Sequence, residues 1–133
     1  MKIKGTICYW DGSEVKVAIE SEEQFSAAGD QDIIDAVSYA LFGKTVYHEI
    51  IHPKKGPPLI ILSIENNERE VYIVRQPQYP RETHFGTKYL SKDVCSIKTE
   101  KEEYDSLDPE KYYMMLDEFL DISEDDFALK CKE

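Results

Sequence analysis

Residues 44–76 read KTVYHEIIHPKKGPPLIILSIENNEREVYIVRQ and hold the densest β-branched and aliphatic content of the chain. Residues 46–52 and 71–75 alternate with a period of two, which is typical of strands. Residues 59–64 form a nearly unbroken apolar run, which predicts a central strand covered on both faces. A proline- and glycine-containing turn separates the first strand from the second, and Asn66-Asn67 suits positive φ angles at a tight hairpin. The stretch therefore predicts a three-stranded antiparallel meander.

The segments before residue 44 predict a hairpin followed by helix. Asp11-Gly12 is a strong tight-turn dipeptide between two alternating stretches. Trp10 beside this turn is either a partner hot spot or a closure for the edge of the core, and we favour the second. Ser21 and Gln24 form a capping signature, and helical spacing continues to residue 42 before Gly43. The pattern leaves open whether residues 21–42 are one kinked helix or two.

The segments after residue 76 predict a loop at 76–87, a further strand at 88–98 and a helix at about 109–121. Asp108 is a good helix cap and Pro109 a favoured first-turn residue. An apolar stripe then continues through this helix. Residues 127–131 suit a short final strand or a docked tail. We therefore predict a single α+β domain spanning residues 1–133, with an antiparallel sheet, a helical segment near 21–42 and a C-terminal helix.

The charge of the chain is −11 and is concentrated near its end. Residues 99–133 hold 13 acids and 4 bases, a net of −9, and the first 98 residues hold 14 acids and 12 bases, a net of −2. Such a surface repels phosphate, which argues against binding to nucleic acid or an anionic membrane, and it favours a cationic partner. The alternative is a solvated surface that only keeps the protein soluble.

Cysteine usage and the N-terminus predict a cytoplasmic protein without cofactors. Cys8, Cys95 and Cys131 are far apart and form no CxxC pair, so neither a disulfide framework nor a cysteine zinc site is indicated. No apolar run suits a signal peptide, and none approaches the ~20 residues of a membrane helix. The oligomeric state stays open at this point.

One short motif has catalytic associations. His48-Glu49-Ile50-Ile51-His52 matches the zinc-metalloprotease signature, which needs a helix to place both histidines on one ion. Pro53 disfavours a helical conformation at His52, and the neighbouring residues are better strand formers. On a strand, the two histidines lie about 13 Å apart and cannot share a metal ion. We therefore favour a non-enzymatic protein, and a zinc-dependent hydrolase is the alternative.

The acidic C-terminal region contains the candidate partner-binding residues. Tyr104 offers an aromatic anchor within a carboxylate cluster. Such a surface would attract a cationic partner, and it could imitate the phosphates of a nucleic acid in the partner's groove. An adaptor that binds another basic protein would use the same surface. The candidates are Glu100, Glu102, Glu103, Tyr104, Asp105, Asp117, Glu118, Asp121, Glu124, Asp125 and Asp126.

The chain also resembles small immunity proteins of bacterial polymorphic-toxin and contact-dependent growth inhibition systems. The resemblance covers the first two-thirds of the chain. It rests on YWDG at 9–12, SEEQF at 21–25, GPPLIILSI at 56–64 and EVYIV at 70–74. It implies tight, non-covalent neutralisation of the C-terminal domain of a cognate toxin, often a basic nuclease or deaminase, without catalysis.

Overall fold

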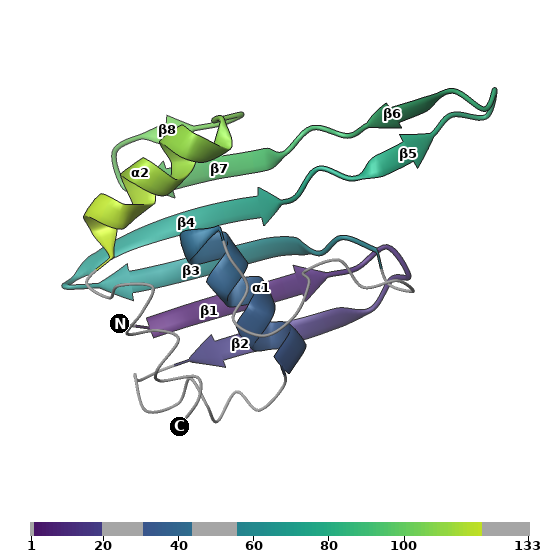
Figure 1. Cartoon of the computed structure of the whole chain (residues 1–133). Helices are drawn as coiled ribbons and strands as arrows, with labels where there is room; N and C mark the ends of the chain where they lie inside the picture. The colour runs from purple at the N-terminus through teal and green to yellow at the C-terminus, as the bar shows by residue number, and fades with distance from the viewer. Residues whose placement is uncertain (1, 20–30, 44–55, 121–133) are drawn as a thin grey trace.

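The computed structural model describes residues 2–19, 31–43 and 56–120, and these form an α+β fold with an antiparallel sheet of six strands (Figure 1). The strands, in spatial order, are β2 (Glu14–Ile19), β1 (Lys2–Cys8), β3 (Leu59–Asn66), β4 (Arg69–Gln76), β7 (Val94–Thr99) and β8 (Glu103–Tyr104). Helices α1 (Gln31–Phe42) and α2 (Pro109–Phe119) lie on one face of this sheet. The predicted fold class is therefore confirmed.

Two tight turns join the first four strands in pairs. The turn between β1 and β2 contains Gly12 at a φ of 87°, and the Asp11 carboxylate accepts hydrogen bonds from the amide (2.8 Å) and hydroxyl of Ser13. In the turn between β3 and β4, the positive φ angles belong to Asn67 (51°) and Glu68 (64°). The predicted hairpin is confirmed, but its turn lies one residue later than the Asn66-Asn67 pair suggested.

The central strand β3 has a different neighbour from the one that the sequence suggested. Cys8 to Lys2 of β1 pair with Leu59 to Glu65, so β1 lies between β2 and β3. The predicted neighbour, residues 46–52, lies outside the described residues, and the meander that forms is β3–β4–β7. The pairing of β1 with β3 joins residues that lie far apart in the chain, so it leaves no local sequence signal. The neighbour of β3 was therefore predicted wrongly.

The hydrophobic core lies between the two helices and one face of the sheet. Strand residues that point toward the helices are almost fully buried, and Tyr112 and Leu116 of α2 meet them from the other side. On the opposite face, Ile61 is 41% exposed and Tyr72 is 49% exposed. The expectation that residues 59–64 are covered on both faces is therefore wrong. An antiparallel sheet can leave one face to solvent.

The C-terminal helix begins as predicted. The Asp108 carboxylate accepts hydrogen bonds from the amides of Glu110 (2.9 Å) and Lys111 (3.4 Å), and Pro109 occupies the first turn. The helix ends at Phe119, whose carbonyl accepts a hydrogen bond from the buried side-chain amide of Asn66 (2.9 Å). That bond satisfies one of the carbonyls that a helix end leaves free and ties α2 to the end of β3.

The helical segment near residues 21–42 is described from residue 31 onward. Helix α1 ends at Phe42, directly before Gly43, as the sequence predicted. The φ of Gly43 is 80°, and its amide donates to the Tyr39 carbonyl (2.8 Å). The capping signature at Ser21–Gln24 and the predicted tail at 127–131 lie outside the described residues. Neither described helix has the length and apolar composition that crossing a lipid bilayer requires.

A second, two-stranded sheet projects beyond the end of β4 and β7 (Figure 1). It consists of β5 (Pro80–Glu82) and β6 (Lys88–Leu90). The prediction of a loop at 76–87 is wrong for β5, and the predicted strand at 88–98 is divided by residues 91–93 into β6 and β7. Strand β5 begins with a proline, is short and lacks period-two alternation, so its sequence does not predict a strand. We call residues 77–92 the arm.

Candidate functional site

The turn between β7 and β8 presents three charged side chains to solvent. The Thr99 amide donates to the Glu102 carbonyl (2.8 Å), and the Thr99 hydroxyl accepts from the amides of Lys101 (3.4 Å) and Glu102 (3.1 Å). These bonds close the turn with its own backbone, so the side chains of Glu100, Lys101 and Glu102 are left exposed. The turn therefore carries two carboxylates and one ammonium group on a well-defined backbone.

Strand β8 extends this acidic surface along the border of the sheet. Glu103 pairs with Lys98 and Tyr104 pairs with Ile97, which makes β8 the last strand of the order. The half-buried Tyr104 donates its hydroxyl proton to the carboxylate of Glu102, and this hydrogen bond is the main reason why the pKa of Tyr104 is raised. A very short, charged edge strand discourages pairing with the backbone of another chain. Recognition at this border therefore depends on side chains.

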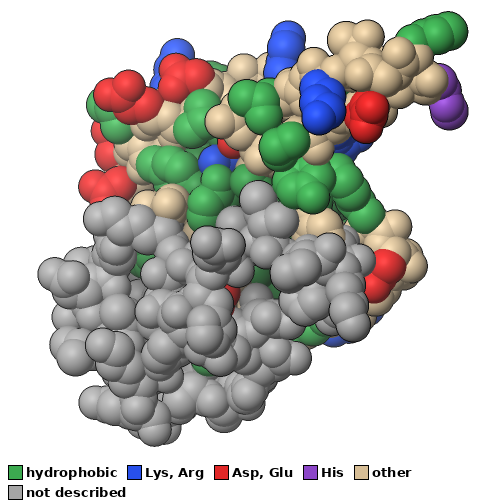
Figure 2. Space-filling model, turned by 45° about the vertical axis from the view of Figure 1, so that its right-hand side comes forward, with side chains coloured by type: hydrophobic (Ala, Val, Ile, Leu, Met, Phe, Trp, Pro, Cys, Tyr) green, Lys and Arg blue, Asp and Glu red, His purple; other side chains and the backbone are tan. Residues whose placement is uncertain are grey.

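Helix α2 adds further carboxylates beside the same border. Its start is fixed by the Asp108 cap and by the Leu107 amide, which donates to the Cys95 carbonyl of β7 (2.9 Å). Asp117 and Glu118 are exposed near the end of the helix. Figure 2 shows acidic side chains gathered at this end of the molecule. We call six of the exposed acids of this region the acidic edge: Glu100, Glu102, Glu103, Asp105, Asp117 and Glu118.

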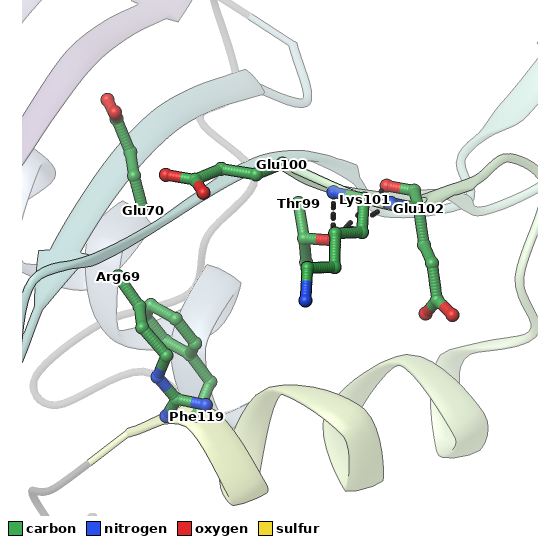
Figure 3. Close-up of a pocket in the computed structure, with 7 residues that line it drawn as sticks. All are labelled: Arg69, Glu70, Thr99, Glu100, Lys101, Glu102 and Phe119. Carbon is green, nitrogen blue, oxygen red and sulfur yellow. Dashed lines mark hydrogen bonds between the residues drawn. The ribbon is translucent and has the colours of Figure 1, made fainter.

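A groove of about 450 Å³ lies beside the acidic edge (Figure 3). The Arg69 guanidinium lies over the Phe119 ring, with its central carbon 4.9 Å from the ring centroid. This cation–π contact joins the β3–β4 turn to the end of α2 and forms one side of the groove. Three carboxylates, two cationic side chains, one threonine and one phenylalanine line the groove: Arg69, Glu70, Thr99, Glu100, Lys101, Glu102 and Phe119.

Glu70 is held in a different way from the carboxylates of the β7–β8 turn. Its carboxylate accepts hydrogen bonds from the hydroxyls of Ser63 (2.9 Å) and Tyr72 (2.9 Å). The bond from Tyr72 is the main reason why the pKa of Tyr72 is raised. Glu70 therefore has a fixed orientation on the sheet, whereas Glu100 lies exposed in the β7–β8 turn (Figure 3).

Most of the predicted binding residues that the structure describes come together. Glu100 and Glu102 line the groove, Glu103 and Asp105 continue the border, and Asp117 and Glu118 lie on α2. Tyr104 is half-buried and bonded to Glu102, so it supports the edge more than it projects from it. The remaining four candidates, Asp121, Glu124, Asp125 and Asp126, lie outside the described residues.

Sequence reasoning missed the Arg69–Phe119 pair and Glu70. These residues come from a turn and a helix end that lie fifty residues apart, and no spacing rule connects them. Arg69 and Glu70 directly follow a positive-φ turn, which is the kind of position where functional side chains project. That was the one local signal that the sequence contained.

A buried arginine forms a separate polar cluster between the helices and the sheet. Arg75 is 2% exposed and donates to the hydroxyls of Tyr113 (3.0 Å) and Tyr39 (3.0 Å) and to the Asp93 carboxylate (2.9 Å). Burial by itself would lower the pKa of Arg75, but the bonds to Tyr113 and Asp93 outweigh it, so this pKa is raised and the charge is retained. Because the Tyr113 hydroxyl also donates to the Tyr39 carbonyl (2.7 Å), the cluster joins α1, α2 and β4. We interpret it as structural.

The zinc motif is not tested by the structure. His48, Glu49 and His52, and the strand predicted around them, lie outside the described residues. Within residues 2–19, 31–43 and 56–120, no group of three or more His, Cys, Asp or Glu side chains is arranged to hold a metal ion. His84 lies in the turn between β5 and β6. Cys95 is buried, and burial raises the pKa of its thiol, which does not suit a nucleophile.

A comparison with protein families, with curated proteins and with solved structures finds no match for this chain.

Proposed function

We propose that this protein is a non-catalytic inhibitor that binds a basic protein through the acidic edge, as an immunity protein binds its toxin. The observation that carries the proposal is the gathering of exposed carboxylates from the β7–β8 turn, β8 and α2 at one border of the sheet. Residues 99–120 contain eight acids and two bases, a net charge of −6. Residues 121–133 follow directly and add five acids and two bases, a further net charge of −3.

This arrangement suits capture of a cationic ligand. A surface of one sign steers an oppositely charged partner during diffusion and can raise association rates well above those of neutral proteins. Rapid capture matters for an inhibitor of a toxin that acts inside the cell that makes it. The groove beside the edge is lined by three carboxylates and offers a place for a side chain such as arginine or lysine to anchor.

If this is an immunity protein, its gene should lie directly downstream of a large toxin gene, and the test uses the C-terminal domain of that toxin as the partner. We expect the double charge reversal Glu103→Lys/Asp105→Lys to slow association by roughly tenfold or more at low salt, and to reduce the dependence of the rate on salt. Stopped-flow association at low and high salt measures both effects. The matched control is Glu14→Lys/Glu65→Lys, which reverses two exposed carboxylates on β2 and β3.

The two variants change the net charge of the protein equally, so they separate the location of the charge from its total. Equal association rates for both double variants would contradict the proposal. Absence of any complex with the upstream domain would contradict its assignment as the partner. Circular dichroism melts of both variants exclude unfolding as the cause of a lost interaction.

A further inference from the structure

We propose that two copies of this protein form a reciprocal dimer, in which the arm of each copy lies along the acidic edge of the other and its tip enters the groove there. The inference does not depend on the proposed function. It rests on the exposure, the construction, the charge and the length of the arm.

The arm has no described layer packed against it along its strands. All six residues of β5 and β6 are exposed. A two-stranded hairpin by itself is marginally stable in water, because it has no buried face. Phe85 at the tip is 96% exposed, and Leu90, which pairs with Pro80 at the base, is 60% exposed. Burying an apolar side chain such as phenylalanine is favourable, so this arm gains stability when a second surface covers it.

The arm is nevertheless held in one conformation at both ends. At the tip, the Thr83 amide donates to the Thr87 carbonyl (2.9 Å), and the Thr83 hydroxyl accepts from the amides of Phe85 (3.3 Å) and Thr87. At the base, Trp10 makes an edge-to-face contact with Tyr79 (4.9 Å between ring centroids), and the Arg81 guanidinium carbon lies 4.5 Å from the Trp10 centroid. A surface that is already ordered loses little entropy on binding.

Trp10 contacts the arm on one side and the chain before β3 on the other. It is 48% exposed and packs on the base of the arm, and a Cβ atom at the buried Gly56 would lie 3.0 Å from its ring. Closure of the core edge and contact with a partner therefore both stay predictions, and the observed contact with Tyr79 supports the arm.

The charge of the arm is opposite to that of the rest of the chain. The arm carries Arg81, Lys88 and Lys92 against Glu82 alone, a net of +2 in a protein of net −11. The complementary surface lies in the same molecule, at the far end of β4 and β7, where the acidic edge and the groove are found (Figure 1). One molecule cannot bring them together, because they lie at opposite ends of the sheet. A second copy can.

The length of the arm matches this arrangement. From Pro77 to Phe85 the chain has nine residues, which reach about 30 Å when extended, and the eight residues of β4 span about 26 Å. If two copies lie antiparallel, each arm runs beside the body of the other copy and Phe85 arrives near its groove. The two contacts are identical, so the assembly closes as a dimer and does not extend into a filament.

The decisive experiment is sedimentation velocity of the full chain over a range of concentrations. We expect a monomer–dimer equilibrium. Phe85→Ala should raise the dimer dissociation constant by roughly tenfold for each of the two contacts, thus about a hundredfold. Ile61→Ala is the matched control, because Ile61 is an exposed apolar residue (41%) on the open face of the sheet. It should leave the equilibrium unchanged.

A charge swap identifies the two surfaces that meet. Arg81→Glu/Lys88→Glu changes the charge of the arm from +2 to −2, and the fourfold reversal Glu100→Lys/Glu102→Lys/Glu103→Lys/Asp105→Lys changes the charge of the acidic edge from −6 to +2. Each variant should be monomeric alone, because both contacts of each homodimer become repulsive. An equimolar mixture should dimerise again, because both contacts of the mixed dimer become attractive. This result is more specific than a salt titration, since salt also screens the repulsion between two copies of charge −11.

Three outcomes overturn the dimer: a monomer at all concentrations, a dimer that is insensitive to Phe85→Ala, or a mixture of the swapped variants that stays monomeric. Each of these leaves the proposed function intact if Glu103→Lys/Asp105→Lys still slows capture of the basic partner. If that double variant captures the partner normally but loses the dimer, the proposed function fails and the dimer stands.

Discussion

Gly5 is the residue at which the sheet has no room for a side chain. A Cβ atom there would lie 1.9 Å from the Ile61 carbonyl oxygen and 2.9 Å from the Leu62 Cα. Because β1 is bonded on both sides, its backbone cannot move away from β3 without breaking one of the two ladders. We expect Gly5→Ala to lower the free energy of unfolding by about 1–3 kcal/mol, as overpacking does.

Urea unfolding measures this loss, and Thr6→Ala is the control on the neighbouring residue. Thr6 is half-buried, so its truncation should change stability by no more than about 0.5 kcal/mol. If Gly5→Ala is as stable as Thr6→Ala, the close approach of β1 and β3 at this position is incorrect.

Tyr113 makes the protein less stable as the pH rises into the alkaline range. Burial raises its pKa to about 12, although Arg75 lowers it in part, and the value in the unfolded chain is about 10. Between these two pH values the unfolded state has lost the proton and the folded state retains it. Stability is therefore unaffected below pH of about 10 and falls as the pH rises toward 12, by about 1.4 kcal/mol per pH unit for one such group.

The Tyr113→Phe variant isolates this contribution. It loses two hydrogen bonds, so it should be less stable at neutral pH by about 1–2 kcal/mol. Its stability should also fall less steeply above pH of about 10, which chemical unfolding at a series of alkaline pH values measures. Burial raises the pKa of Tyr39 and Tyr112 as well, so part of the slope remains. Equal slopes for the variant and the parent would refute the assignment.

At the scale of the elements, the cap of α2 holds the acidic edge in place. Asp108→Ala removes the acceptor of the Glu110 and Lys111 amides and should cost about 1 kcal/mol of stability. Asp117→Ala removes an exposed negative charge near the C-terminal end of the same helix, where the helix dipole is negative. It should leave the stability of the protein unchanged or raise it slightly. Thermal unfolding of the two variants compares them directly. A larger loss for Asp117→Ala would contradict this explanation of the helix start.

Elements with strong local signals could be predicted from the sequence. Asp11-Gly12 predicted the first hairpin, and Asp108-Pro109 predicted α2, because a turn or a cap depends on residues that are neighbours in the chain. The insertion of β1 between β2 and β3 joins residues separated by more than fifty positions, and no local pattern encodes it. The arm was missed because its strands bury nothing, so the alternation that predicts strands is absent.

The candidate site was predictable in its charge and not in its shape. Carboxylates that follow one another in the chain stay together on a turn and a short strand, so Glu100, Glu102 and Glu103 could be predicted as a cluster. The groove needed the fold, because Phe119 reaches Arg69 only when α2 packs beside the β3–β4 turn.

At the scale of the whole molecule, the two proposals compete for one surface. The acidic edge cannot bind a basic partner while the arm of a second copy covers it. Only the monomer is then competent to bind, and the apparent dissociation constant for the partner is the intrinsic value divided by the monomer fraction. The arm would therefore act as a stored, displaceable ligand, and a partner that binds the edge would convert dimers into monomers.

Phe85→Ala tests this coupling, because it removes an anchor of the dimer and leaves every carboxylate of the acidic edge in place. About a hundredfold above the dimer dissociation constant of the parent, about 7% of its chains and about half of the variant's chains are monomeric, so the variant should bind the basic partner roughly sevenfold more tightly than the parent. About a hundredfold below that constant, both should bind equally, since both are then monomers. Equilibrium titrations at these two concentrations measure the difference. If the parent binds the partner equally well at both concentrations, the arm and the partner do not share a surface. Either the dimer or the partner then binds a face other than the acidic edge.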